Sequence, residues 1–139
     1  MWHTIIIAGN VGRDPEMRYT PSGQAVTSFS VGTDASYTGS DGQRVKKTVW
    51  FRISAWGKLA ETCSQYLKKG SKVLIEGRLT PDDKGNPRTF QRNDGTTSAS
   101  YEVNASTVRF LSSRTEGTGT GEEIAAGSGA SAEGEEIPF

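Results

Sequence analysis

The chain has 139 residues, 33% of them hydrophobic, and its 16 Lys and Arg balance 16 Asp and Glu. This size and composition predict one domain with a modest core, and the lack of an apolar run of about 18 residues excludes a membrane-spanning helix. One cysteine, Cys63, and one histidine, His3, exclude an intramolecular disulfide and a four-ligand zinc site. The first ten residues have no signal-peptide or transit-peptide pattern, so we expect a cytoplasmic protein. We expect no metal and no cofactor.

Two strands are predicted in the first part of the chain. Residues 3–11 are a β-branched run, and residues 24–34 alternate between polar and apolar side chains. The stretch between them is rich in turn residues and contains Pro15, Pro21 and Gly23. Residues 36–47 include the dipeptide Asp41-Gly42, which is a strong signal for a β-hairpin.

The next strand, residues 48–56, has large side chains on both of its faces. Successive side chains of a strand point to opposite sides, so one face carries Val49, Phe51, Ile53 and Ala55, a normal core pattern. The other face carries Trp50, Arg52 and Trp56.

One helix and two more strands are predicted after it. Residues 58–71 predict a helix with one apolar face, formed by Leu59, Ala60, Cys63, Tyr66 and Leu67. Lys68 and Lys69 lie at its expected negative end, and Gly70 is its expected cap. Residues 72–79 and 100–111 are strands. Residues 80–98 contain two turn signals, Lys84-Gly85 and Asp94-Gly95, and predict a protruding ribbon. Five strands with one helix between the third and fourth is the element order of an OB-fold, an all-β Greek-key barrel.

Charge and composition change near residue 113. Residues 1–113 carry 15 Lys and Arg against 10 Asp and Glu, whereas residues 114–139 carry one Arg against six Glu. We therefore predict a barrel domain at 1–112 and a flexible, disordered tail rich in Gly and Glu at 113–139. The tail ends in Ile137, Pro138 and Phe139, an apolar tip that indicates a ligand for another protein.

Trp50 and Trp56 have two interpretations. Both rings could be buried against the helix or another subunit, since aromatic residues usually pack. Arg52 between them favours exposure, because burying an unpartnered charge is costly. Exposed aromatic rings beside cations can stack the bases and pair with the phosphates of a single nucleic-acid strand. Two hairpin aromatics extend this pattern, each beside cations: Tyr37 near Lys46 and Lys47, and Phe90 between Arg88 and Arg92.

Two alternatives remain open at this point. The exposed aromatics could instead form a protein-interaction surface, and the strand bound could be RNA, because stacking does not read the sugar. An enzyme is disfavoured, because no carboxylate cluster or nucleophile-base pair has a catalytic spacing.

Three segments, "GNVGRDPEMRYTPSGQAVTSFSV", "WFRISAWGKLAE" and "QYLKKGSKVLIEGRL", together with the "EEIPF" end, closely resemble the bacterial single-stranded DNA-binding protein family. The resemblance implies an OB-fold that assembles as a homotetramer and wraps single-stranded DNA in replication, recombination and repair. It puts base-stacking aromatics at Tyr37, Trp50, Trp56 and Phe90, and cations that contact the DNA backbone at Arg52, Lys58 and Lys69. It also makes the tip, Glu135, Glu136, Ile137, Pro138 and Phe139, a docking peptide for DNA-maintenance enzymes.

Overall fold

A computed structural model describes residues 1–112, which contain nine strands and one helix. In chain order these are β1 (Ile5–Val11), β2 (Glu16–Tyr19), β3 (Ala25–Asp34), β4 (Tyr37–Thr38), β5 (Arg44–Val45), β6 (Thr48–Trp56), α1 (Lys58–Tyr66), β7 (Lys72–Leu79), β8 (Arg88–Gln91) and β9 (Thr97–Phe110). The predicted tail and its tip lie outside the described residues.

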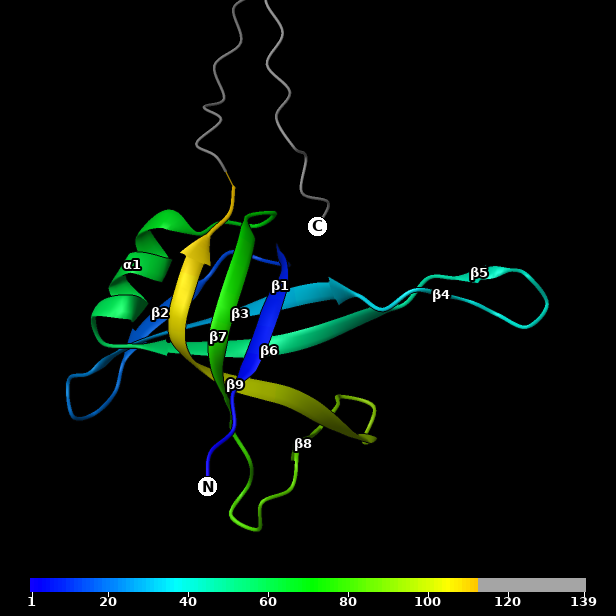
Figure 1. Cartoon of the computed structure of the whole chain (residues 1–139). Coiled ribbons are helices and arrows are strands. Elements are labelled where there is room, and N and C mark those ends of the chain that lie inside the picture. Colours follow the sequence, from blue (N-terminus) through cyan, green and yellow to red (C-terminus); the bar gives the residue numbers. More distant parts are fainter. Residues whose placement is uncertain (113–139) are drawn as a thin grey trace, which may run out of the picture.

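Five of the strands close into a barrel (Figure 1). The neighbours run in the order β1, β7, β9, β6 and β3, and pairing between the ends of β1 and β3 closes the ring. The β6–β9 pair is parallel, and the other pairs are antiparallel. The helix α1 follows the third barrel strand and precedes the fourth, so the predicted OB-fold is confirmed.

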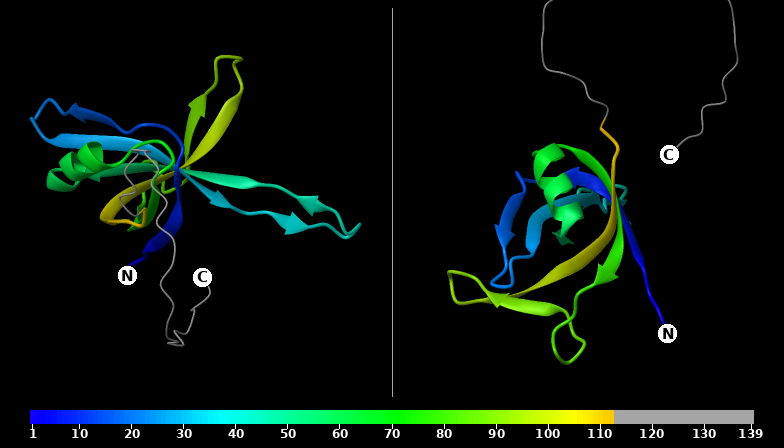
Figure 2. Two further views of the ribbon diagram at one scale, coloured as in Figure 1. Left: turned by 90° about the horizontal axis from the view of Figure 1, so that it is seen from above. Right: turned by 90° about the vertical axis from the view of Figure 1, so that its left-hand side faces the viewer.

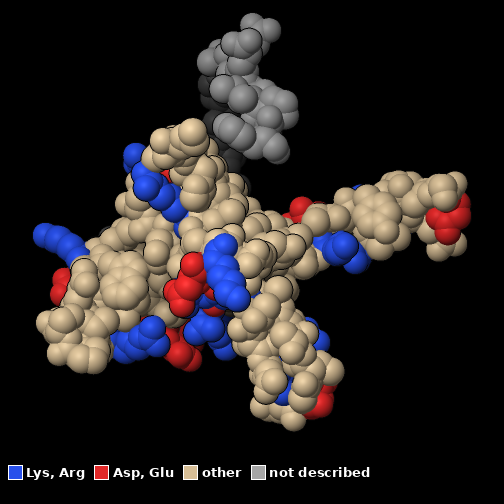
Figure 3. All heavy atoms as spheres, turned by 90° about the horizontal axis from the view of Figure 1, so that it is seen from below, with Lys and Arg blue, Asp and Glu red and all other residues tan. Residues whose placement is uncertain are grey.

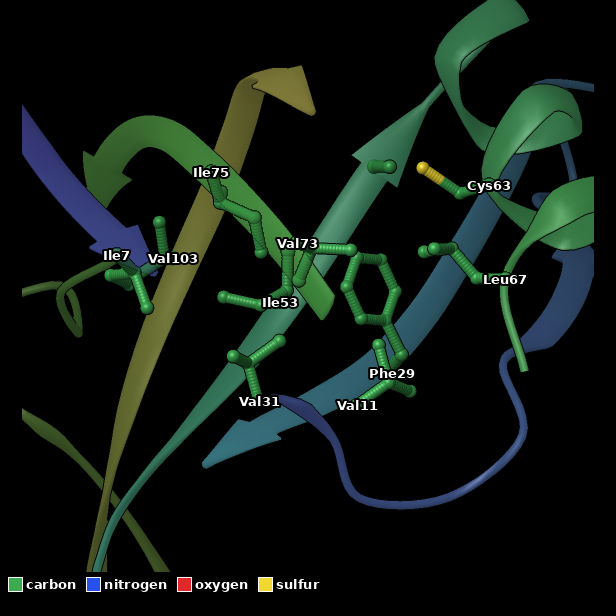
Figure 4. Packing of buried hydrophobic residues seen from close by; sticks show 11 residues of the cluster. Ile7, Val11, Phe29, Val31, Ile53, Cys63, Leu67, Val73, Ile75 and Val103 are labelled. Carbon is green, nitrogen blue, oxygen red and sulfur yellow. The ribbon is translucent and has the colours of Figure 1, made fainter. Parts of the chain in front are cut away.

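The core follows the alternation predicted from the sequence. Phe29 and Val31 of β3 and Ile53 of β6 point into the barrel and are buried. In Figure 4 the Phe29 ring lies between these strands and Leu67, which follows α1. The one buried polar residue in the described chain, Thr27, is satisfied, because its hydroxyl donates a 2.7 Å hydrogen bond to the carbonyl of Ala60 in α1.

The end of the helix differs from the prediction. Helix α1 ends at Tyr66, and Leu67 is already extended, so Lys68, Lys69 and Gly70 lie beyond the helix. Gly70 has a φ of 88°, and its N–H donates a hydrogen bond to the carbonyl of Val11. This glycine therefore forms the turn that leads into β7 beside the end of β1, instead of capping the helix. Burial of the Leu67 side chain in the core accounts for the early end of the helix.

Cys63 is a core residue of α1. Its side chain is fully buried, and desolvation raises the pKa of the thiol to about 11. The reactive thiolate is therefore scarce at neutral pH, which fits a packing role.

Two hairpins project away from the barrel (Figure 2). One is formed by β4 and β5 around Asp41-Gly42, and the other by β8 and the start of β9 around Asp94-Gly95. Gly42 and Gly95 both have positive φ, as tight hairpin turns require. The ribbon predicted over residues 80–98 is therefore present.

Among the described residues, no helix is long and apolar enough to cross a membrane.

Candidate functional site

The outer face of β6 carries Trp50, Arg52 and Trp56, as the alternation predicts. Trp50 is 53% exposed and Trp56 39%, and the Arg52 side chain between them is exposed. The interpretation that both rings are buried against the helix is therefore wrong. Because six residues of strand span about 20 Å, the two rings stand well apart along β6 with the guanidinium between them.

The Trp50 ring rests on two glycines of neighbouring strands. Gly32 is the partner of Trp50 in the β3–β6 pair, and a Cβ built on it would lie 3.0 Å from Cζ3 and Cη2 of the ring. A Cβ on Gly12, just after β1, would overlap Cζ3. The Gly12 N–H donates a 2.9 Å hydrogen bond to the carbonyl of Ser30, which fixes this backbone under the ring. The two glycines thus form a seat for the indole, because a side chain at either position would push the ring away.

A groove of about 440 Å³ opens beside Trp50, between this seat and the base of the β4–β5 hairpin. Three cations line it, Arg44, Lys46 and Lys47. Asp34 also lines the groove, and hydrogen bonds from the hydroxyl and N–H of Ser36 lower the pKa of its carboxyl. At neutral pH the groove therefore combines one aromatic wall with three positive charges and one negative charge.

Trp56 is held at the other end of β6 by a side-chain hydrogen bond. Its indole Nε1 donates to Oδ1 of Asn104 in β9 at 3.2 Å. Val26, opposite Trp56 in the β3–β6 pair, is fully buried. One edge of the indole is thus bonded to the barrel while two-fifths of the residue remains open to a ligand.

The two hairpin aromatics are exposed and lie apart from the groove. Tyr37 pairs with Val45 in the β4–β5 hairpin and is 55% exposed, and Phe90 pairs with Ser98 in the β8–β9 hairpin and is 49% exposed. Neither lines the groove beside Trp50. The structure therefore distributes the four predicted aromatics over the barrel and both hairpins.

The predicted cations have different surroundings. Lys58 begins α1 and is exposed. Lys69 lies in the turn beside Gly70, whose carbonyl accepts a hydrogen bond from the Asn10 side chain on the groove wall. Arg88 forms an ion pair of 3.7 Å with Glu102, and Arg92 donates a 3.0 Å hydrogen bond to Ser98. Roles of these residues in binding stay predictions.

Sequence reasoning missed five residues of this surface: Gly12, Gly32, Arg44, Glu102 and Asn104. Arg44 could have been included, because "RVKK" is a continuous basic stretch after the hairpin turn. The glycine seat and the β9 contacts depend on strand register between distant segments, which side-chain alternation alone does not reveal.

Charge on the barrel is mixed. In Figure 3, basic side chains follow the hairpins and the barrel surface, with acidic side chains among them and near the hairpin tips.

Within residues 1–112 no group of three or more His, Cys, Asp or Glu is arranged to hold a metal ion. Exposed rings beside cations can stack planar bases and neutralise phosphates.

A closed five-stranded barrel with such a face defines an OB-fold of the kind that can hold an oligonucleotide. The chain belongs to the single-strand binding protein family, whose model matches residues 2–111. A single-stranded DNA-binding protein of Neisseria meningitidis is 42% identical over 115 residues, which are 83% of this chain and 63% of that protein. Single-stranded DNA-binding protein 1 of Chlorobaculum tepidum is 40% identical over 116 residues, 84% of this chain and 68% of that protein. The chain thus spans less than two thirds of the Neisseria relative.

Two solved structures resemble the barrel. The small single-stranded DNA-binding protein from Streptomyces coelicolor has a TM-score of 0.63 and 26% identity, over 78% of this chain and 93% of that chain. A deletion mutant of the single-stranded DNA binding protein from Thermus aquaticus has a TM-score of 0.61 and 25% identity, over 80% of this chain and 51% of that chain.

Proposed function

We propose that this chain binds single-stranded DNA of any sequence and protects it during replication, recombination and repair. The observation that carries this proposal is the outer face of β6, where two exposed tryptophans flank Arg52. Bases stack on aromatic rings whatever their sequence, with about 1–3 kcal/mol per base. Family membership and the names of the relatives support DNA as the ligand. Binding, without catalysis, is the proposed activity, and we expect association with the nucleoid in the bacterial cytoplasm.

In the proposed complex, bases stack on Trp50, Trp56, Tyr37 and Phe90. Phosphates contact the cations of the groove and the predicted basic residues, which are Arg52, Lys58, Lys69, Arg88 and Arg92. The groove supports this path, since it places Arg44, Lys46 and Lys47 beside the Trp50 ring. A strand running along β6 would thus meet the positive charge of the groove beside Trp50 and that of Arg52 between its two stacking sites.

Titration with an oligo-thymidine strand tests the function. Tryptophan emission should be quenched on binding, and the affinity should fall as salt rises, with a log–log slope of about 0.7 per neutralised phosphate. A matched oligo-uridine strand tests the RNA alternative in the same assay. Absence of both quenching and salt dependence would exclude the proposal and favour a protein-interaction surface.

The glycine seat gives a sharper prediction about Trp50. Gly12→Ala should displace the Trp50 ring, because the added Cβ overlaps Cζ3 of the ring. DNA affinity should then fall about 3- to 10-fold, which is part of the free energy of stacking one base. The measurement is the same titration in two backgrounds. In a Trp50→Ala background the glycine substitution should cost nothing more, and a further loss there would show that Gly12 acts independently of the ring.

We also propose that the chain acts as a homo-oligomer, most simply a homotetramer. Large apolar side chains are exposed on the barrel strands β1 and β7, including Ile6 and Leu79. Such surfaces usually mark interfaces. Light scattering of the purified chain should give about four times the monomer mass, and a monomer at micromolar concentration would contradict this assembly.

The last part of the proposal concerns the tip, which lies outside the described residues. We propose that Glu135, Glu136, Ile137, Pro138 and Phe139 recruit DNA-maintenance enzymes, because an apolar segment preceded by two carboxylates fits an apolar pocket flanked by cations. A labelled peptide of residues 131–139 should bind such an enzyme. The same peptide without Phe139 should not, and equal binding of the two peptides would reject the tip as the recognition element.

A further inference from the structure

One row of side chains on β9 touches the predicted DNA-binding residues of both neighbouring strands. The row is formed by every second residue of β9, so all its side chains leave the sheet on one face; its members are Ser98, Ser100, Glu102 and Asn104. Asn104 accepts a hydrogen bond from Trp56 of β6, and Ser98 accepts one from Arg92, which follows β8. The row therefore lies between the β6 surface and the β8–β9 hairpin.

Glu102 is the charged member of this row and lies between two arginines. Its Oε2 is 3.7 Å from Nε of Arg88, which is the one ion pair within residues 1–112. In the parallel β6–β9 pair its register partner is Arg52, so both side chains leave the sheet on the same face. Glu102 thus pairs with one cation, Arg88, and shares its face of the sheet with a second, Arg52, and the proposed function assigns both to phosphate contacts.

Glu102 is also held firmly in place. Its side chain is 24% exposed, its Oε1 accepts a 3.0 Å hydrogen bond from the Ser100 hydroxyl, and its backbone carbonyl accepts one from Thr80. Arg88 is restrained as well, because Nε donates to the carbonyl of Pro81 at 3.3 Å. These bonds hold the negative charge on the face that the proposed strand crosses.

We infer that Glu102 limits the affinity of this face for a single strand. This inference rests on the proposed function and identifies the residue that regulates it. A fixed carboxylate repels the phosphates of a strand crossing β6 and β9, and it occupies the guanidinium of Arg88. A bound strand accordingly dissociates more readily than it would from a face carrying cations alone.

The test is the isosteric variant Glu102→Gln, titrated with the same oligo-thymidine strand. Affinity should rise about 3- to 6-fold at about 50 mM salt. The gain at about 50 mM should be about 2- to 3-fold larger than at about 200 mM, because one more neutralised phosphate steepens the log–log slope by about 0.7. Weaker or unchanged binding would overturn the inference, since it would mean that Glu102 positions Arg88 productively or faces no phosphate.

Two controls separate local from general effects. Glu76→Gln makes the same change in net charge on β7, a strand that carries none of the predicted DNA-binding residues, and should leave affinity within about 1.5-fold of wild type. An equal gain from Glu76→Gln would overturn the inference in favour of net charge. In an Arg88→Ala background the gain from Glu102→Gln should shrink, and an undiminished gain would overturn the role given to that arginine.

The inference and the proposed function fail differently. If the wild-type chain binds no single strand, both are wrong. If the wild type binds with the expected quenching and salt slope while Glu102→Gln binds no more tightly, the function stands and the inference about Glu102 alone is rejected. Equal urea midpoints of the two proteins will show that folding does not cause the difference.

Discussion

Replacing Trp50 with alanine should weaken binding of an oligo-thymidine strand about 10- to 100-fold. The ring is 53% exposed, sits on the Gly12 and Gly32 seat, and forms the wall of the cationic groove. Loss of one stacked base removes about 1–3 kcal/mol, and about 1.4 kcal/mol corresponds to a tenfold change in affinity. Fluorescence anisotropy of a labelled strand measures the change without relying on tryptophan emission.

Trp2→Ala is the matched control for this prediction. Trp2 is also an exposed tryptophan, 68% exposed, but its ring lies under the guanidinium of Arg78 at 5.6 Å instead of on the β6 face. Its removal should leave DNA affinity nearly unchanged. Equal losses in the two variants would show that exposure of an indole, and not its place beside Arg52 and the groove, accounts for binding.

Replacing Phe29 with alanine should lower the free energy of unfolding by about 3–5 kcal/mol, the usual cost of deleting a buried phenylalanine. Its ring is 2% exposed and lies at the centre of the core, between the barrel strands and Leu67 (Figure 4). The cost has two parts, the lost burial of the ring and the cavity that it leaves, which barrel strands joined by continuous pairing fill only in part. Urea unfolding followed by circular dichroism measures the change.

Phe90→Ala provides the comparison for Phe29. Phe90 is 49% exposed in the β8–β9 hairpin, so its loss should change the free energy of unfolding by at most about 0.5 kcal/mol. The effects on DNA binding should be reversed. Phe90→Ala should weaken binding, whereas the Phe29→Ala protein should bind normally under conditions in which it is folded. A large loss of stability in Phe90→Ala would mean that this hairpin packs against another part of the protein, such as a second subunit.

Much of the barrel could be predicted because side-chain alternation is a local property. In β6 the buried Ile53 and Ala55 and the exposed Trp50 and Trp56 occupy the faces that a period of two requires. Both hairpin turns were predictable for the same reason, since Asp-Gly meets the demand for positive φ within the turn itself.

The end of α1 was predicted wrongly because local and tertiary preferences compete there. Lys68, Lys69 and Gly70 are good residues for the last turn of a helix. The chain instead becomes extended at Leu67, whose side chain is buried in the barrel, and Gly70 bonds to Val11. Tyr66 was expected on the core face, but it is exposed and its ring packs beside Phe110 at 6.1 Å.

By itself the sequence determined the OB-fold through the order of its elements, and the strand that carries Trp50, Arg52 and Trp56 through side-chain alternation. It determined the family through three matching segments. Only the tertiary structure decided what surrounds those side chains. The glycine seat under Trp50, the Asn104 bond to Trp56 and the position of Glu102 beside Arg52 all come from strands distant in sequence. Such contacts depend on the register between strands, and a shift of one residue would turn each of these side chains to the opposite face of the sheet.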